Sequence, residues 1–331
     1  MICIVQERRP PARREEVGVQ SRDVRDCSKG TLKHELQRGG SDQPSLGSFG
    51  ATGIGAPRSV LARERARIAR AMLADCRFCA HDCGVNRLAD ENGLCHAGAE
   101  ARFFSAQTEV ADERELVPTF NVALSGCDLR CDFCITGASS WNPRAGAGFD
   151  ARAMAKQAKA ALEGGARTIQ LLGGEPTVHL PAALEFVSWL PETVRLVWKT
   201  NAHGSARARE LLDGLFDVWL ADFKFGNDAC AQRLSKTPDY VRVVKENLLW
   251  AAEHSELIVR HLLMPGHVEC CWQPVAEWLA GNLPGVKVNL RSGFWPAWQV
   301  ARHAELRRTV SGPESARAVD LAQSLGLNLI P

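Results

Sequence analysis

Three cysteines in one short segment constrain the fold of this chain more than any other feature of its sequence. Cys127, Cys131 and Cys134 have the spacing C-x3-C-x2-C, and they follow the segment 119–124, a predicted strand. Thiolates at this spacing can bind three irons of one cubane 4Fe-4S cluster, which normally takes four ligands. A zinc site would need a fourth protein ligand, so the triplet favours a cluster with one iron open to a small molecule.

The sequence around this triplet predicts an α/β fold. From about residue 117, short runs rich in β-branched residues alternate with segments of helical periodicity. The predicted strands are 119–124, 168–172, 195–200, 218–223, 257–263 and 286–290. The predicted helices lie near 150–163, 181–190, 205–213, 237–253, 272–281 and 314–325. Six such units predict a parallel, right-handed partial (β/α)6 barrel, with its functional groups at the carboxyl ends of the strands.

Three parts are predicted along the chain. Residues 1–56 are rich in Arg, Gly, Ser and Pro and show no apolar period, so we expect a disordered leader. Residues 57–116 are expected to hold a helix with Ser59 as its N-cap, followed by an N-terminal cysteine-rich element. Residues 117–331 form the predicted barrel.

Composition and charge argue against several classes of protein. The chain is 45% hydrophobic but contains no run of eighteen apolar residues, so no membrane span is expected. Seven of its 12 cysteines fall into two tight clusters and no signal peptide precedes them, which predicts reduced thiols and a cytoplasmic location. Residues 1–70 contain 14 Lys and Arg against 8 Asp and Glu, whereas the remainder contains 26 against 30. A mildly acidic barrel makes nucleic acid an unfavoured partner.

Four further cysteines precede the predicted barrel. Their spacing is C-x2-C-x3-C-x11-C, at positions Cys76, Cys79, Cys83 and Cys95. Four thiolates spaced in this way can complete a tetrahedral zinc site or hold a second Fe-S cluster, and both alternatives remain open. His81 and His96 could replace a thiolate, but we expect both to face solvent.

Two strand ends after the triplet carry recognisable motifs. The second strand ends in Gly173, Gly174 and Glu175, where the two glycines let a ligand approach the backbone closely. The fourth strand places Asp222 and Lys224 on one face, because side chains alternate along a strand. An acid and a base in that position form either a structural ion pair or a clamp for a ligand.

The third and fifth strand ends add polar groups at the same edge. The third strand ends in Lys199, Thr200 and Asn201, and the fifth contains Arg260 and Leu262 before a Pro-Gly pair. Taken alone, Arg260 could equally be a salt-bridged residue and Leu262 a core residue.

Together these motifs resemble the radical S-adenosylmethionine (SAM) superfamily, and within it the PflX-like homologues of pyruvate formate-lyase activating enzyme. The resemblance covers about residues 73–295, including the Gly-Val-Asn-Arg sequence after the third upstream cysteine. It implies that SAM occupies the open iron, and that its binding residues are Phe133, Gly173, Gly174, Glu175, Asn201, Asp222, Lys224, Arg260 and Leu262. In this resemblance Phe133 and Leu262 lie beside the adenine, and Lys224 faces the carboxylate of SAM.

The resemblance implies an enzyme that cleaves SAM reductively to a 5′-deoxyadenosyl radical for hydrogen abstraction. Its implied partners are a glycyl-radical enzyme to be activated, or a peptide or small-molecule substrate, and a flavodoxin- or ferredoxin-like electron donor. Two departures concern the substrate side. Lys199 replaces the acid that helps hold a cation in the activating enzymes, so no monovalent ion site is predicted, and residues 135–143 lack the expected Gln-Asn pair. A non-catalytic zinc or Fe-S electron-transfer protein is the alternative class.

The remaining cysteines receive no predicted role. Two lie in the leader, one lies in a helical segment and two follow a histidine: Cys3, Cys27, Cys230, Cys270 and Cys271. Adjacent cysteines form awkward disulfides and are more often small apolar residues, so we expect the last pair to pack in the core.

Overall fold

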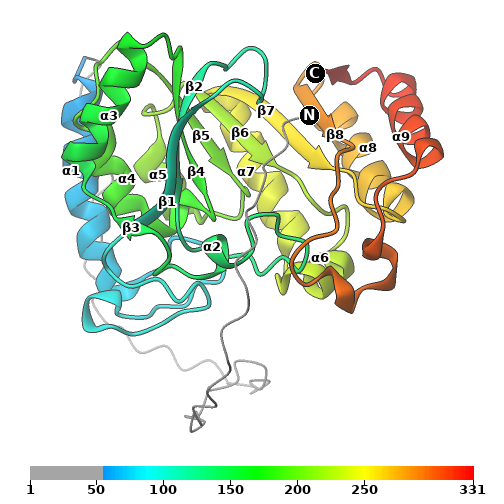
Figure 1. Ribbon diagram of the computed structural model, residues 1–331, viewed down its shortest axis with the longest axis horizontal. Helices are drawn as coiled ribbons and strands as arrows, with labels where there is room; N and C mark the ends of the chain where they lie inside the picture. The colour runs from blue at the N-terminus through cyan, green and yellow to red at the C-terminus, as the bar shows by residue number, and fades with distance from the viewer. Residues whose placement is uncertain (1–54) are drawn as a thin grey trace, which may run out of the picture. The chain divides into compact units, whose positions relative to one another are not determined.

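The computed structural model describes residues 55–331, which contain one nine-stranded sheet with helices packed against it (Figure 1). The order of the strands in the sheet is β3-β1-β2-β4-β5-β6-β7-β8-β9. The strands are β1 (Arg102–Glu109), β2 (Thr119–Leu124), β3 (Ala147–Gly148), β4 (Thr168–Gly173), β5 (Arg195–Thr200), β6 (Val218–Asp222), β7 (Glu256–Leu262), β8 (Lys287–Arg291) and β9 (Asn328–Leu329). The predicted leader, residues 1–56, lies almost wholly outside the described residues.

Strands β2 and β4 to β8 are the six predicted strands, and they are parallel to one another. The sheet does not close on itself, because β3 and β9 form its two edges. The partial (β/α)6 barrel is therefore confirmed. The register pairs Leu124 with Gly173 and Asp222 with Arg260, which brings the carboxyl ends of strands distant in sequence to one edge of the sheet.

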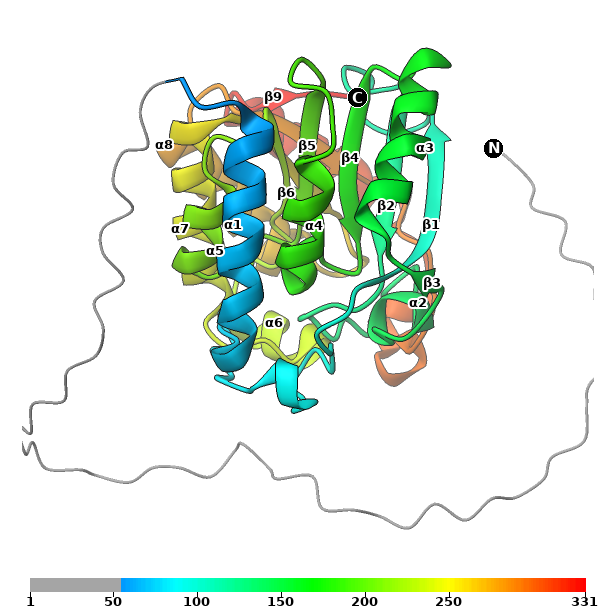
Figure 2. The same ribbon diagram turned by 90° about the vertical axis from the view of Figure 1, so that its left-hand side faces the viewer.

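Helices precede and follow the strands along the chain. They are α1 (Arg58–Met72), α2 (Ala138–Trp141), α3 (Ala151–Glu163), α4 (Leu180–Val187), α5 (Ala206–Leu212), α6 (Asp228–Ser235), α7 (Tyr240–His254), α8 (Gln273–Asn282) and α9 (Gly312–Ser324). Figure 2 shows α1, α3 and α4 together on one side of the sheet. Within residues 55–331, no helix combines the length and the apolar character that a membrane crossing needs.

Helix α1 begins differently from the prediction. Pro57 occupies its N-cap position, and the backbone N–H of Ser59 donates to Glu192 Oε1 at 3.1 Å. Arg58 at the same turn donates to the carbonyl of Val194 at 2.6 Å. The expected Ser59 cap is therefore wrong, because contacts with a distant loop, rather than a local side chain, satisfy the start of the helix.

The loop between β1 and β2 packs against the inner face of the partial barrel. Leu116 from this loop is fully buried and packs with four apolar strand residues that are also fully buried, namely Val197, Val218, Leu220 and Ile258. Asp112 and Glu113 from the same loop pair with basic residues on β5 and β7. This layer forms a floor beneath the carboxyl ends of the strands.

Candidate active site

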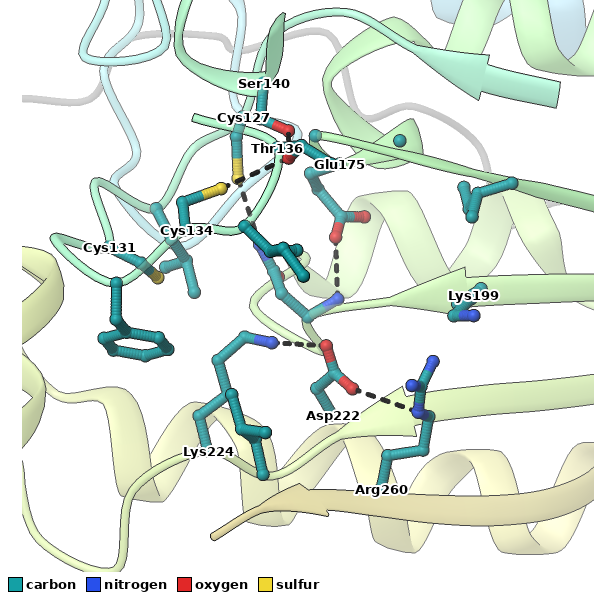
Figure 3. A pocket seen from close by; sticks show the side chains of 18 of the residues that line it. Cys127, Cys131, Cys134, Thr136, Ser140, Glu175, Lys199, Asp222, Lys224 and Arg260 are labelled. Atoms are coloured by element: carbon teal, nitrogen blue, oxygen red, sulfur yellow. Dashed lines mark hydrogen bonds and ion pairs between the residues drawn. The ribbon is translucent and has the colours of Figure 1, made fainter. Parts of the chain in front are cut away.

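A cavity of about 400 Å³ lies at the carboxyl ends of the parallel strands (Figure 3). All three cysteines of the triplet and all nine residues predicted to bind the cofactor line it. They are Cys127, Cys131, Cys134, Phe133, Gly173, Gly174, Glu175, Asn201, Asp222, Lys224, Arg260 and Leu262. The fold thus gathers the whole predicted set in one place, while the role of each residue in binding stays a prediction.

The cysteine triplet lies in a loop held by helix α6. The backbone N–H groups of Arg130 and Asp132, on either side of Cys131, donate to the carbonyls of Ser235 and Leu234 at 3.0 and 2.9 Å. Cys127 and Cys131 are buried, and Cys134 is half-buried. Burial raises the pKa of the Cys131 thiol to about 12, and the nearby Lys224 opposes this shift.

The triplet fits a cluster better than a single metal ion. Within residues 55–331, the groups of three or more donors that lie within 4.8 Å of one another do not include these sulfurs. Thiolates that bind different irons of one cubane are necessarily farther apart than ligands of one ion. Three thiols facing one cavity match the donor set that a 4Fe-4S cluster with an open iron requires.

Gly173 and Gly174 bring the end of β4 directly against the backbone that leads into the triplet. Gly173 has φ +135°, and a Cβ there would lie 2.1 Å from the carbonyl oxygen of Leu124. A Cβ on Gly174 would lie 1.9 Å from the carbonyl oxygen of Gly126. Neither position has room for a side chain, so both glycines are required by the close approach of two backbones.

Glu175 connects the ends of β4 and β5. Its carboxylate accepts hydrogen bonds from the hydroxyls of Thr177 and Thr200 at 2.6 and 2.9 Å, and from the backbone N–H of Asn201 at 2.7 Å. Burial and the charge of Asp128 raise the pKa of Glu175 to about 7, whereas the hydrogen bonds act in the opposite direction. Both of its oxygens are engaged by donors of the protein itself.

Asp222, Lys224 and Arg260 form a charged wall of the cavity (Figure 3). Asp222 pairs with Lys224, and Arg260 Nε lies 3.9 Å from Asp222 Oδ1 and 3.2 Å from Glu113 Oε1. Burial would raise the pKa of Asp222, but the two cations hold it below its usual value. The ion pairs considered from the sequence are therefore present, and they face the cavity.

The lysine that departs from the activating-enzyme pattern has an acidic partner from elsewhere. Lys199 Nζ lies 2.6 Å from Asp112 Oδ2, and Asp112 Oδ1 lies 3.9 Å from Arg260 Nη1. Sequence reasoning missed Asp112 and Glu113, because they belong to the loop before β2 and no strand-end motif marks them.

The upstream four-cysteine element contacts both sides of the site. Arg87 of its Gly-Val-Asn-Arg sequence is buried and donates to the carbonyl of Val178, after β4, at 2.7 Å. His81 is half-buried and its Nε2 lies 3.0 Å from the carbonyl oxygen of Asp128, so the expectation that it faces solvent is wrong. His96 is exposed.

The upstream sulfurs do not share the spacing of ligands to one ion. Cys76, Cys79, Cys83 and Cys95 contribute no group of three donors within 4.8 Å of one another in the described chain. Which metal they bind, zinc or an Fe-S cluster, stays a prediction. A different triad does meet this distance, and it consists of His81, Asp128 and His203. Both carboxylate oxygens of Asp128 are already engaged, one by Asn201 and one by His203 Nδ1, whereas His203 Nε2 is buried without a hydrogen-bond partner among residues 55–331.

The adjacent cysteines pack on the core as expected, with Cys271 inside it and Cys270 against it, but the structure adds a feature that was not predicted. Cys230, His267, Cys270 and Cys271 converge, with all four donor atoms within 4.8 Å of one another. The adjacent pair is therefore part of a polar cluster and does not simply fill the core. The signal in the sequence was His267-x2-Cys270-Cys271, but its fourth member lies about forty residues upstream on another helix.

The family to which these features point is the radical SAM superfamily, whose model matches residues 122–279. The chain belongs to that superfamily. More particularly, it is similar to the uncharacterized protein MJ0674 of Methanocaldococcus jannaschii, with 31% identity over 276 residues that cover 80% of this chain and 79% of that protein.

Solved structures of low sequence identity match parts of this chain. SuiB of Streptococcus suis bound to S-adenosylmethionine matches with a TM-score of 0.48 and 13% identity, over 61% of this chain and 47% of SuiB. The chain thus spans about half the length of SuiB. A domain of pyruvate-formate lyase-activating enzyme from Bacteroides vulgatus matches with a TM-score of 0.39 and 18% identity, over 49% of this chain and 96% of that domain.

Proposed function

We propose that this protein is a radical SAM enzyme that abstracts hydrogen from a glycine of a partner polypeptide. One observation carries the proposal: three thiols, and no fourth from residues 55–331, share a single cavity with the glycine turn and the charged strand ends typical of the superfamily. A flavodoxin- or ferredoxin-like protein would supply the electron, and a reducing cytoplasm would suit the free thiols.

The residues of this chain would act mainly by binding and orientation. Cys127, Cys131 and Cys134 would hold the cluster, which when bound supplies the electron that cleaves SAM to methionine and a 5′-deoxyadenosyl radical. The Asp222 carboxylate raises the pKa of Lys224 against the effect of burial, so the lysine remains a cation able to face the carboxylate of SAM. The N–H of Lys224 donates to the hydroxyl of Tyr240 at 2.7 Å, which fixes its backbone.

The mouth of the cavity supports a polypeptide as the substrate. Ile135 and Trp295 line the cavity, yet their side chains are 78% and 66% exposed. Phe133 is buried beneath them, where it packs edge-on against Phe225 with ring centroids 6.0 Å apart. Exposed apolar side chains at a functional opening are typical of a surface that contacts another macromolecule.

Anaerobic SAM cleavage tests the enzyme class. The full chain is reconstituted with iron and sulfide and given SAM and dithionite, and 5′-deoxyadenosine is measured by mass spectrometry. We expect SAM-dependent product from the wild type and from Cys27→Ala, and none above background from Cys131→Ala. A wild type that forms no 5′-deoxyadenosine would instead favour an electron-transfer protein.

The partner is tested separately by following the hydrogen atom. A candidate glycyl-radical enzyme, labelled with deuterated glycine, is incubated with the reduced enzyme and SAM. We expect deuterium in the 5′-deoxyadenosine and a glycyl radical by electron paramagnetic resonance. Cleavage without deuterium transfer would retain the radical SAM activity and point to another peptide or to a small molecule.

A further inference from the structure

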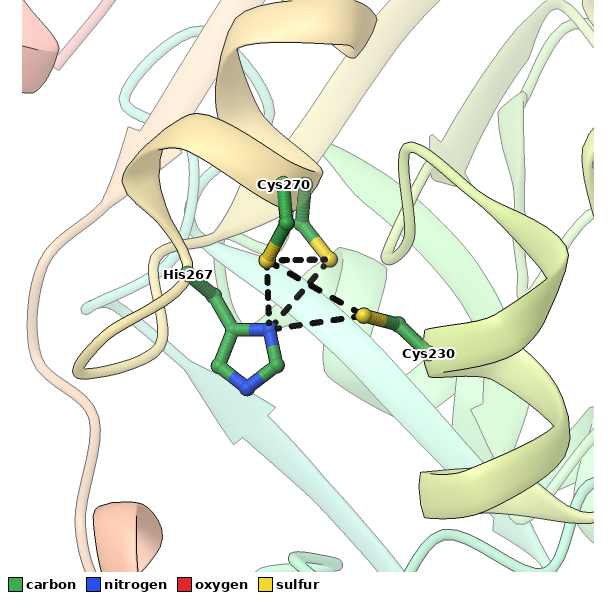
Figure 4. Close-up of side chains that lie close together, drawn as sticks. Cys230, His267 and Cys270 are labelled. Carbon is green, nitrogen blue, oxygen red and sulfur yellow. Dashed lines mark hydrogen bonds between the residues drawn. The ribbon is translucent and has the colours of Figure 1, made fainter.

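Four potential metal ligands converge away from the cavity, between helix α6 and the segment after β7 (Figure 4). Cys270 Sγ lies 3.9 Å from both Cys230 Sγ and Cys271 Sγ. His267 Nδ1 lies 3.2, 3.4 and 3.8 Å from the sulfurs of Cys270, Cys271 and Cys230. None of these residues lines the described cavity.

These separations match the edges of a tetrahedron around zinc. Zinc binds cysteine sulfur at about 2.3 Å and histidine nitrogen at about 2.0–2.1 Å, so tetrahedral angles place sulfurs about 3.8 Å apart and sulfur about 3.5 Å from nitrogen. The two sulfur–sulfur distances of 3.9 Å lie close to the first value, and the three nitrogen–sulfur distances, 3.2, 3.4 and 3.8 Å, lie on both sides of the second. A disulfide would need a sulfur separation of about 2.05 Å, well below the 3.9 Å observed.

The backbone is arranged so that adjacent cysteines can both reach one point. Cys270 and Cys271 lie in a π-helical turn, Val268–Trp272, in which the N–H of Trp272 donates to the carbonyl of His267 at 3.1 Å. Consecutive residues of an α-helix point about 100° apart, and the wider turn changes that relation. Single π-helical turns occur mostly at functional sites.

Neighbouring side chains orient the ligands. Asn227 donates to Cys230 Sγ at 3.4 Å and to the carbonyl of Cys270 at 2.6 Å, which connects the two halves of the group. On the other side, Glu305 Oε1 lies 3.8 Å from His267 Nε2 and 2.5 Å from Arg233 Nη1. Arg233 Nη2 lies closer to the same ring nitrogen, at 3.4 Å, so the Arg233–Glu305 pair together orients the ring of His267.

Most of the group is enclosed by the protein. Cys271 is fully buried, His267 is 3% exposed and Cys230 is 9% exposed, while Cys270 is half-buried. A Cβ on Gly226 would lie 2.4 Å from the carbonyl oxygen of Cys271, so the loop after β6 lies directly against the π-helical turn. Four protein ligands in an enclosed site leave no position for a substrate, which is the pattern of structural zinc.

We propose that Cys230, His267, Cys270 and Cys271 bind one zinc ion through three thiolates and Nδ1 of His267. The three thiol protons leave to solvent when the metal binds. The ion fastens α6 to the segment after β7, and α6 carries the carbonyls of Leu234 and Ser235 that hold the cysteine triplet loop. Its role is to position that loop.

Metal analysis of variants tests the site. The full chain is purified without oxygen from zinc-supplemented cells, before any iron or sulfide is added, and zinc is counted per chain. We expect Cys230→Ala and Cys271→Ala each to lose about one zinc per chain, with no loss in Cys27→Ala. Cys79→Ala measures the zinc bound by the upstream four-cysteine element. The double variant Cys79→Ala/Cys230→Ala then separates the zinc of that element from the zinc of the proposed site. Equal zinc in the wild type and both site variants would overturn the proposal.

A labelling experiment on the wild type avoids the risk that a variant fails to fold. Iodoacetamide modification is mapped by peptide mass spectrometry before and after chelation of zinc. We expect Cys230, Cys270 and Cys271 to be alkylated at least about tenfold faster after chelation, since metal-bound thiolates are shielded. Unchanged rates, protection that only a reductant removes, or iron bound at this site would each contradict zinc binding. Neither experiment depends on SAM, so its failure is distinct from failure of the proposed enzyme activity.

Discussion

The pKa values of two acidic residues in the floor of the cavity are shifted in opposite directions. Burial would raise the pKa of Asp112, but a hydrogen bond from Glu113 and the charges of Lys199 and Arg260 hold it well below its usual range. Burial and the hydrogen bond to Asp112 raise the pKa of Glu113 to about 7. The floor therefore carries one carboxylate and, below neutral pH, one protonated carboxyl.

Glu113→Gln is expected to stabilise the protein more at pH 8 than at pH 5. In the wild type, the unfolded chain loses the Glu113 proton near the ordinary glutamate pKa of 4.5, while the folded chain retains it to about 7, so folding stability falls across this interval. Glutamine has no proton to lose, and it can still accept from Asn289 Nδ2, which lies 3.1 Å from Glu113 Oε1.

The free energy of unfolding that Glu113→Gln adds at pH 8 relative to pH 5 should approach but not exceed roughly 3 kcal/mol, because one pKa unit corresponds to about 1.4 kcal/mol. Thermal and denaturant unfolding at both pH values measures it. Glu163→Gln, at an exposed position at the end of α3, controls for the change in formal charge. A benefit equal at both pH values would contradict the raised pKa.

Single residues differ in how far the sequence can place them. The gathering of the triplet and the strand-end motifs around one cavity could be predicted, because each lies at the end of a strand and parallel strands end at one edge. Lys199 has no visible partner in the sequence, since Asp112 is 87 residues away. Cys230 is likewise separated from Cys270 by 40 residues, and only the pairing of β6 with β7 brings their elements together.

At the scale of elements, burial decides what the sequence predicts. Strand β2 is buried along its whole length and four of its six residues are apolar, so its sequence indicates a buried strand. Strand β1 was missed because its residues are half-buried or exposed and its register with β2 shifts between Phe103 and Ser105. Strands β3 and β9 have two residues each, too few for any periodicity.

Gly174→Ala is expected to disrupt the junction between β4 and the triplet loop. The new methyl group would meet the carbonyl oxygen of Gly126, which already accepts from the N–H of Glu175 at 2.9 Å. Because backbone on both sides must move, we expect a loss of stability of about 1–3 kcal/mol or more. After reconstitution, iron content should fall well below the about four atoms of one cluster.

Gly281→Ala is the matched control for this change. A Cβ on Gly281, within α8, would meet nothing within 4 Å, and alanine favours a helix. Its iron content and stability should equal or exceed those of the wild type. If Gly174→Ala behaves like this control, the close approach of the two backbones is not needed for cluster binding.

At the scale of the molecule, the triplet loop is also held by the C-terminal part of the chain. The N–H of Gln299 donates to the carbonyl of Asp132 at 2.8 Å. The side chain of Asp132 is buried and hydrogen-bonded to His303 Nε2 at 2.7 Å. Residues about 170 positions later in the chain therefore hold the same loop that α6 also holds.

His303→Ala should loosen this loop without unfolding the protein. Loss of a buried hydrogen bond costs roughly 1–3 kcal/mol, so amide hydrogen exchange in residues 127–134 should quicken about tenfold. Peptide-level hydrogen exchange of the wild type and the variant measures it. His254→Ala, at the exposed end of α7, should leave exchange in this loop unchanged. Equal protection in both variants would show that α6 alone suffices.

Under the proposed function, the floor of the cavity has a consequence for the partner polypeptide. Leu116 and the apolar residues around it fill the sheet below the charged layer, so a reacting group must come in from the side of the strand ends. A glycine packed inside a folded partner cannot make that approach until its loop detaches. Only the partner molecules whose loop is open can bind. The free energy of this local opening sets their fraction, and the apparent affinity falls in proportion to that fraction. The stability of the partner, as much as the chemistry of this enzyme, then sets the rate of activation.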